Sequence, residues 1–169
     1  MLERRWVVMG VSGCGKSTLG RLWADHLGLP FIEGDDEHPP ENIAKMASGH
    51  ALDDADRLPW LLRLQARIAK ARESGSGLVV TCSALKRQYR DLLRSADPQL
   101  ILLHLHGTPA LLAQRLAARR GHFAPASLLE SQLRDLEPLA SGEAGLRLDS
   151  AQSPAQWMEQ LCRAFPECA

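Results

Sequence analysis

The chain carries Gly10-Val11-Ser12-Gly13-Cys14-Gly15-Lys16-Ser17 directly after the apolar residues 6–9. This is a complete G-x-x-x-x-G-K-[ST] sequence, placed where a strand is expected to end and a helix to begin. Glycines in such a turn allow positive φ angles and let backbone N–H groups approach an anion, and the following helix N-terminus adds partial positive charge. The stretch therefore predicts a phosphate-binding loop. The alternative, a glycine-rich turn with a chance lysine, is disfavoured by the strand before it and the helix after it.

Two side chains of the loop have expected chemical roles. Lys16 would reach the β- and γ-phosphates of a nucleoside triphosphate, and the Ser17 hydroxyl would be a Mg²⁺ ligand. Cys14 is interpreted as a small residue that fits the loop. The predicted nucleotide-binding residues are Gly10, Val11, Ser12, Gly13, Cys14, Gly15, Lys16, Ser17, Thr18, Arg119 and Arg120.

Length, charge and cysteine content limit the class of protein. The 169 residues suit one domain, and 20 basic against 20 acidic residues leave no net field to attract nucleic acid or an anionic membrane. No apolar run approaches membrane-spanning length and no signal-peptide segment is visible, so we expect a cytoplasmic protein without membrane or nucleic-acid partners. The four cysteines show no zinc-ligand spacing with the six histidines, so reduced thiols are expected. His104 and His106 have no partnered motif and are interpreted as structural.

Short apolar runs alternate with helical patterns along the chain. The runs cover residues 6–9, 31–32, 78–82, 100–105 and 146–148. This alternation is typical of an α/β fold, with a parallel sheet of about five strands and helices on both faces. A long polar insert at 35–56 follows the second run, and no internal repeat or linker divides the chain.

The ends of the predicted strands hold side chains suited to catalysis, because ligands of open α/β sheets bind beyond the carboxyl ends of the strands. After the second run, Asp35 is our candidate to orient an acceptor hydroxyl and take its proton during phosphoryl transfer. Glu33 is a candidate partner for a Mg²⁺-bound water. Asp36 and Glu37 are interpreted as solvated turn residues.

Basic side chains supply candidates for anion binding. A helix expected from about Leu85 would place Lys86 and Arg90 on one face by their i, i+4 spacing, where they would clamp an anionic substrate group. Arg119 and Arg120 precede a glycine between two helical patterns, as in a mobile lid that brings cations to the phosphates. A solvated basic helix end is the alternative for this pair.

Together these motifs resemble those of the bacterial-type gluconate kinases (gluconokinases). Besides the phosphate loop, the matching segments are Gly34-Asp35, His38-Pro39, Asn42-Ile43-Ala44-Lys45-Met46-Ala47-Ser48-Gly49, Leu52-Asp53-Asp54, Asp56-Arg57, Pro59-Trp60-Leu61, Cys82-Ser83-Ala84-Leu85-Lys86, Tyr89-Arg90-Asp91-Leu92-Leu93-Arg94, Arg119, Gly121-His122-Phe123 and Leu136-Glu137-Pro138. The resemblance extends to about residue 138 and is more specific than the loop alone, because the insert belongs to the family's substrate side. One departure follows Gln132, where the family pattern has an aromatic and an acidic residue and this chain has Leu133-Arg134.

The resemblance implies a P-loop NTPase fold like that of the nucleoside monophosphate kinases. It implies a single domain over residues 1–169, with a substrate-binding insert at about 35–60 and a lid at about 119–137. The implied reaction is phosphorylation of the terminal hydroxyl of D-gluconate by ATP with Mg²⁺, in a homodimer. The implied catalytic residues are Asp35, Lys16 and Arg119, and Ser17 is the implied metal ligand. The implied substrate-binding residues are Asp35, His38, Asn42, Lys45, Met46, Arg57, Lys86, Arg90 and His122.

Two other functions stay open. A small kinase of the shikimate or adenylylsulfate type would share the phosphate loop and the strand-end carboxylate, although the insert at 42–60 favours gluconate. A nucleotide-binding regulator that hydrolyses ATP only slowly belongs to a different class. Such a regulator has no need of an acceptor-activating carboxylate at Asp35.

Overall fold

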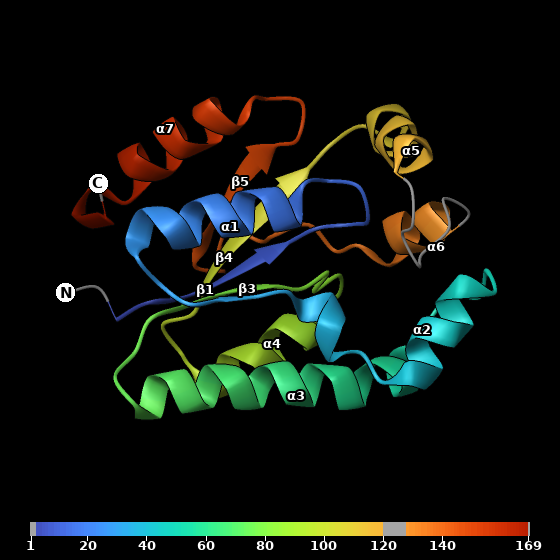
Figure 1. Ribbon diagram of the computed structural model, residues 1–169, viewed down its shortest axis with the longest axis horizontal. Helices are drawn as coiled ribbons and strands as arrows, with labels where there is room; N and C mark the ends of the chain where they lie inside the picture. The colour runs from blue at the N-terminus through green and yellow to red at the C-terminus, as the bar shows by residue number, and fades with distance from the viewer. Residues whose placement is uncertain (1–2, 120–127, 169) are drawn as a thin grey trace.

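The computed structural model describes residues 3–119 and 128–168, which are built around a five-stranded parallel sheet (Figure 1). The strands are β1 (Arg5–Met9), β2 (Phe31–Ile32), β3 (Leu78–Thr81), β4 (Ile101–His106) and β5 (Gly145–Asp149). Their order in the sheet is β2-β3-β1-β4-β5, and the pairings are parallel throughout, with Val7 beside Val80 on one side and Leu102 on the other. The predicted α/β class and strand number are confirmed.

Helices cover both faces of this sheet (Figure 1). They are α1 (Lys16–Leu27), α2 (Pro40–Ala47), α3 (Asp54–Glu73), α4 (Arg87–Ala96), α5 (Pro109–Ala118), α6 (Leu128–Asp135) and α7 (Pro154–Ala164), with short 3-10 helices at Gly34–Glu37 and Pro166–Cys168. α1 and α7 lie on one face, α3 and α4 lie on the other, and α2, α5 and α6 gather beyond the carboxyl ends of the strands. Within the described ranges, no helix combines the length and apolar character needed to cross a bilayer.

The core lies on both sides of the central strand β1. Its residues Trp6, Val7, Val8 and Met9 are fully buried, as expected for a strand covered on both faces. Trp6 packs edge-on against Trp23 of α1, with ring centroids 5.3 Å apart. The end of β1, from which the phosphate loop begins, is therefore fixed by packing.

Two elements differ from the expectations drawn from sequence. The polar insert contains a helix, α2, which begins with Pro40 in its first turn, where a proline is tolerated. α4 begins at Arg87 rather than near Leu85, because the backbone of Lys86 is extended, with φ −96° and ψ 150°. Lys86 and Arg90 therefore do not share a helical face, and that part of the prediction is wrong.

Candidate active site

The phosphate loop joins β1 to α1 with the backbone geometry of an anion cradle. Gly10 and Gly15 have φ angles of +141° and +104°, which favour glycine. A Cβ at Gly10 would lie 2.5 Å from the carbonyl oxygen of Leu105, so only glycine lets the loop pass the neighbouring strand. Lys16 is the first residue of α1, and its Nζ donates to the carbonyl oxygen of Val11 at 3.0 Å. The lysine thus folds back over the centre of the loop.

The connection between β5 and α7 braces this loop from outside. Ser150 is fully buried, and its hydroxyl donates to the carbonyl oxygen of Cys14 at 2.8 Å. Arg115 of α5 donates in turn to the carbonyl oxygen of Ser150 at 2.6 Å. Trp157 of α7 packs on Gly15, where an added Cβ would lie 3.0 Å from the indole ring. These residues were missed by the sequence analysis, since a lone serine in a turn and a core tryptophan carry no distinctive pattern.

An open hollow lies beside the loop, between α1, α5 and α7. Thr18, Arg115, Arg119 and Trp157 are among its lining residues. Arg119 is exposed at the end of α5 and lines the hollow, and its predicted contact with the nucleotide stays a prediction. The predicted ligands Arg120 and His122 lie outside the described residues.

An enclosed cavity lies between the phosphate loop, the insert and α6. It is lined by Ser12, Lys16, Asp35, His38, Met46, Ala51, Leu52, Arg57, Ser83, Leu128, Ser131 and Gln132. The two groups predicted to carry the chemistry, Lys16 and Asp35, therefore share one cavity. Three of the residues predicted to bind substrate, His38, Met46 and Arg57, line it with them.

Asp35 is positioned by a close fit of Gly34 against β3. A Cβ at Gly34 would lie 1.8 Å from the carbonyl oxygen of Thr81, which no other residue type could accommodate. The Gly34 N–H donates to the Thr81 hydroxyl at 2.9 Å, and its carbonyl oxygen accepts from the Trp60 indole at 2.7 Å. These contacts turn the chain after β2 and bring Asp35 into the cavity. Glu33 accepts a hydrogen bond from Thr81 and does not line the cavity.

Of the two neighbouring carboxylates, Asp36 is solvated as the sequence indicated, whereas Glu37 is half-buried and ion-paired rather than solvated. Asp36 is exposed, and Glu37 pairs with Arg67 of α3 at 2.9 Å on the outside of the molecule. Neither residue lines the cavity. Asp35 is thus separated from its two acidic neighbours by the turn of the 3-10 helix.

His38 presents a neutral imidazole to the cavity. Its ring stacks on Trp60 with centroids 4.0 Å apart, and its Nδ1 lies 3.3 Å from the side-chain nitrogen of Asn42. Burial, reinforced by the positive charge of Arg57, lowers the pKa of His38 to about 4. A neutral imidazole can donate a hydrogen bond to a hydroxyl group or accept one from it, but it does not attract an anion.

Arg57 brings a buried positive charge to the same cavity. The residue is 5% exposed, and its Nε donates to the carbonyl oxygen of Leu52 at 3.3 Å. Its nearest carboxylate is that of Asp135 on α6, with Nη2 4.0 Å from the oxygen. Both contacts are long for a buried guanidinium, which can form two short parallel hydrogen bonds with a carboxylate. Arg57 is thus arranged to receive an anionic group.

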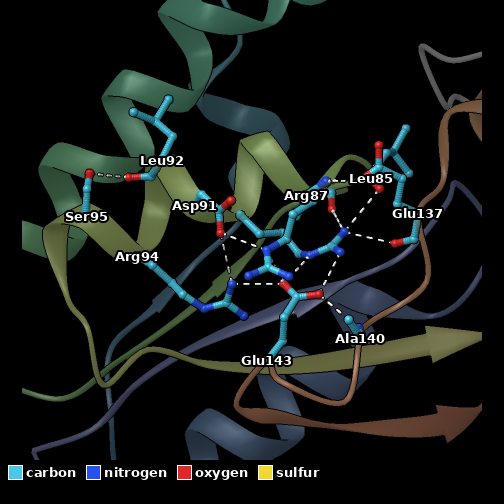
Figure 2. Close-up of polar contacts among 11 residues, drawn as sticks. Leu85, Arg87, Asp91, Leu92, Arg94, Ser95, Glu137, Ala140 and Glu143 are labelled. Carbon is cyan, nitrogen blue, oxygen red and sulfur yellow. Dashed lines mark hydrogen bonds and ion pairs between the residues drawn. The ribbon is translucent and has the colours of Figure 1, made fainter.

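Arg90 does not reach the cavity, contrary to the prediction that it clamps an anionic substrate group. Its guanidinium forms two 2.8 Å bonds to Glu143 and donates to the carbonyl oxygens of Ala84, Leu85 and Glu137. Figure 2 shows this cluster around Glu143, at the base of the segment that joins α6 to β5. Arg90 is 1% exposed, and its charge is balanced by a buried carboxylate rather than left for a ligand.

The remaining predicted substrate ligands make contacts within the protein. Lys45 pairs with Asp56 at 2.6 Å, and Asn42 donates to the carbonyl oxygen of Asp56 at 2.8 Å. Lys86 pairs with Asp54 of α3 at 2.8 Å. None of the three predicted ligands lines the enclosed cavity. Asn42 and Lys45 hold α2 against α3, and Lys86 holds the start of α4 against α3, so the three residues support the site without lining the cavity.

α6 closes the cavity with residues that the sequence analysis did not assign. The Oε1 atom of Gln132 accepts the backbone N–H of Ser12 at 2.7 Å. Leu128 joins Met46 and Leu52 in a small apolar cluster that is separate from the main core. The sequence held one signal for this contact. Gln132 is a polar residue four positions after Leu128, on a face that otherwise reads as apolar.

A glycine-rich loop after β1, a lysine at the start of α1 and a carboxylate at the end of β2 define a P-loop kinase. A family model for shikimate kinase matches residues 12–165 of the chain. A gluconokinase from Gluconobacter oxydans (strain 621H) is 46% identical, over 94% of this chain and 89% of that protein. The thermosensitive gluconokinase of Escherichia coli (strain K12) is 43% identical, over 96% and 87%. The chain belongs to the gluconokinase family.

Solved structures agree with this assignment. A gluconokinase from Sinorhizobium meliloti 1021 superposes with a TM-score of 0.87 at 45% identity, covering 99% of this chain and 94% of the other. A sugar kinase from Janibacter sp. HTCC2649 gives a TM-score of 0.90 at 48% identity, covering 95% and 92%. The fold predicted from the family resemblance is therefore confirmed.

Proposed function

We propose that this protein transfers the γ-phosphoryl group of ATP to the terminal hydroxyl of D-gluconate, giving 6-phospho-D-gluconate and ADP. The observation that carries the proposal is the enclosed cavity in which Asp35, Lys16 and the buried Arg57 meet. Binding and phosphorylation of gluconate need a cation for its carboxylate and a base for its terminal hydroxyl, and this cavity holds both. The gluconokinases among the relatives support the same substrate.

ATP would lie with its phosphates on the loop and its base in the hollow beside Arg119 and Trp157. Lys16 would then leave the carbonyl oxygen of Val11 and bind the β- and γ-phosphates. Ser17, in the first turn of α1, would ligate Mg²⁺, which neutralises phosphate charge when bound. Mg²⁺ held by one hydroxyl and substrate phosphates needs no cluster of three protein ligands, and residues 3–119 and 128–168 contain none.

Gluconate would bind with its carboxylate on Arg57 and its terminal hydroxyl toward Asp35. The neutral His38 suits a sugar hydroxyl, because it can donate or accept one hydrogen bond without adding charge. Met46 and Leu52 supply apolar walls for the carbon chain. The insert would thus recognise the substrate, and α6 would exclude water from it.

The chemical step follows from these positions. Asp35 accepts the proton of the terminal hydroxyl of gluconate as the hydroxyl oxygen forms a bond to the γ-phosphorus of ATP. The bond from that phosphorus to the β,γ-bridging oxygen breaks, and its electron pair leaves with ADP. Lys16 and Arg119 stabilise the negative charge on the phosphates as the phosphoryl group moves.

The test is ADP release measured with D-gluconate, shikimate, adenylylsulfate or no acceptor. D-gluconate is expected to give by far the highest kcat/KM. Preference for shikimate or adenylylsulfate would indicate another small kinase. Equal ADP release with and without an acceptor would indicate a nucleotide-binding regulator that hydrolyses ATP slowly. The homodimer stays a prediction from the resemblance, and the cytoplasmic location stays a prediction from the sequence alone.

A further inference from the structure

One backbone N–H of the phosphate loop is hydrogen-bonded to a side chain that lies 120 residues later in the sequence. The Ser12 N–H donates to Oε1 of Gln132 on α6, at 2.7 Å. Backbone N–H groups of such loops are the donors that hold phosphate oxygens. The amide oxygen of Gln132 therefore occupies a position that suits a phosphate oxygen.

The Ser12 N–H differs from other N–H groups of the loop. Gly10 donates to the carbonyl oxygen of Ser83 at 3.2 Å, and Cys14 donates to that of Val11 at 3.3 Å. Those two donors are part of the loop's own structure. The Ser12 N–H instead donates to a side chain that lines the enclosed cavity, and Ser12 lines the same cavity. A ligand bound there can therefore replace Gln132 as the acceptor.

Gln132 itself lies among the groups that carry out the reaction. The residue is 9% exposed on the inner face of α6, and it shares the cavity with Lys16 and Asp35. A carboxamide carries two N–H donors beside its oxygen, and it is uncharged. With the oxygen turned to the loop, the donors lie at the same site without adding negative charge near a phosphate.

We propose that Gln132 contacts the transferred phosphoryl group, a role that rests on the proposed kinase function. When the γ-phosphate takes over the Ser12 N–H, the Gln132 amide donates an N–H to a non-bridging oxygen of the same phosphoryl group. Gln132 gains and loses no covalent bond. It stabilises negative charge while phosphorus passes from the leaving ADP oxygen to the substrate hydroxyl oxygen, whose proton goes to Asp35. Transfer is then efficient only while α6 lies on the loop.

The first test compares Gln132→Leu with Glu130→Gln, an exposed residue two positions earlier on the same helix. Gln132→Leu should lower kcat roughly 10²-fold, the scale for losing one donor to transition-state charge, with both KM values within about threefold of wild type. Gln132→Glu keeps an acceptor for Ser12 but adds negative charge, so kcat should fall at least as far. Glu130→Gln should behave as wild type.

The second test separates a phosphoryl contact from a structural role. ADP with Mg²⁺ and aluminium fluoride mimics the phosphoryl group in flight, and ADP alone does not. Gln132→Leu should bind the mimic roughly 10²-fold more weakly than wild type while binding ADP normally. Equal weakening of both ligands, or a kcat close to that of wild type, would overturn the inference. A wild-type protein that does not phosphorylate gluconate would instead refute the proposed substrate, since the mimic comparison requires no gluconate.

Discussion

At the scale of single residues, we propose that Arg57 decides which substrates the cavity accepts. Its charge is buried, and its polar contacts are a 3.3 Å bond to Leu52 and a 4.0 Å approach to Asp135, beside a cation–π contact with the Tyr89 ring at 5.7 Å. A substrate carboxylate would therefore form short charge-assisted hydrogen bonds with Arg57, whereas an uncharged sugar would leave the buried guanidinium without a close anionic partner. The preference for an acid over a neutral sugar should depend on this one side chain.

We expect Arg57→Gln to raise the KM for gluconate by about 10²-fold, because a hydrogen bond between charged groups contributes about 1.5–3 kcal/mol. The KM for ATP should change little, since Arg57 does not line the hollow proposed for the nucleotide. Arg67→Gln is the matched control, because Arg67 is an exposed residue on the same helix. Steady-state kinetics with each substrate varied in turn would check this. An equal rise in both KM values would show that Arg57 acts on the fold rather than on gluconate.

At the scale of elements, the Arg90–Glu143 pair ties α4 to the segment between α6 and β5. Burial raises the pKa of Glu143, but its hydrogen bonds to Arg90, Ala140 and Arg94 outweigh that effect and lower it to about 2. The carboxylate is therefore ionised and fully buried. Loss of Glu143 would leave Arg90 as an uncompensated buried charge, whereas loss of Arg90 would leave Glu143 paired with Arg94 at 2.9 Å.

Glu143→Leu should lower the free energy of unfolding by about 3–5 kcal/mol, the usual cost of leaving a buried charge without its partner, and Arg90→Met should lower it by less, because Arg94 still pairs with Glu143. The double variant Arg90→Met with Glu143→Leu should lose less free energy of unfolding than the sum of the losses in the two single variants. Arg163→Met, in the exposed pair with Glu159, should cost less than about 1 kcal/mol. Urea unfolding of the four variants would measure these differences. Additive losses in the double variant would contradict a direct Arg90–Glu143 interaction.

The elements also show where sequence reasoning succeeds and fails. The sheet could be predicted because strands buried on both faces, such as residues 6–9, are continuous apolar runs. The positions of Asp35, just after β2, and of Lys16, at the start of α1, could be predicted because both are set by local sequence. Arg90 and Gln132 could not, because their partners, Glu143 and Ser12, lie 53 and 120 residues away and share no periodic pattern with them.

At the scale of the whole molecule, two buried histidines make stability depend on pH. Burial, reinforced mainly by Arg147, lowers the pKa of His104 to about 4, and His38 is lowered to about 4 as well. Their ordinary value is 6.5, so between pH 6.5 and 4 the unfolded chain binds protons that the folded protein does not. The stability from these histidines is therefore complete above about pH 6.5 and is lost as the pH falls toward 4.

His104→Leu should reduce this acid-side loss. Both ring nitrogens of His104 are buried without a hydrogen-bond partner among the described residues, so leucine removes an unsatisfied polar group as well as a titrating one. The variant should be at least as stable as wild type at pH 7 and more stable at pH 5. His50→Leu, at an exposed position, should leave the pH profile unchanged. Thermal unfolding midpoints between pH 4.5 and 8 would test this, and an unchanged slope for His104→Leu would contradict it.

The most direct test of the mechanism compares Asp35→Asn with Asp36→Asn. Asparagine keeps the size of aspartate but does not accept a proton, so Asp35→Asn should lower kcat for gluconate phosphorylation roughly 10²-fold or more, with a much smaller change in the KM for ATP. Asp36 is exposed outside the cavity, so Asp36→Asn should keep the wild-type rate. A wild-type rate for Asp35→Asn, or a loss confined to Asp36→Asn, would contradict the assignment of Asp35 as the base.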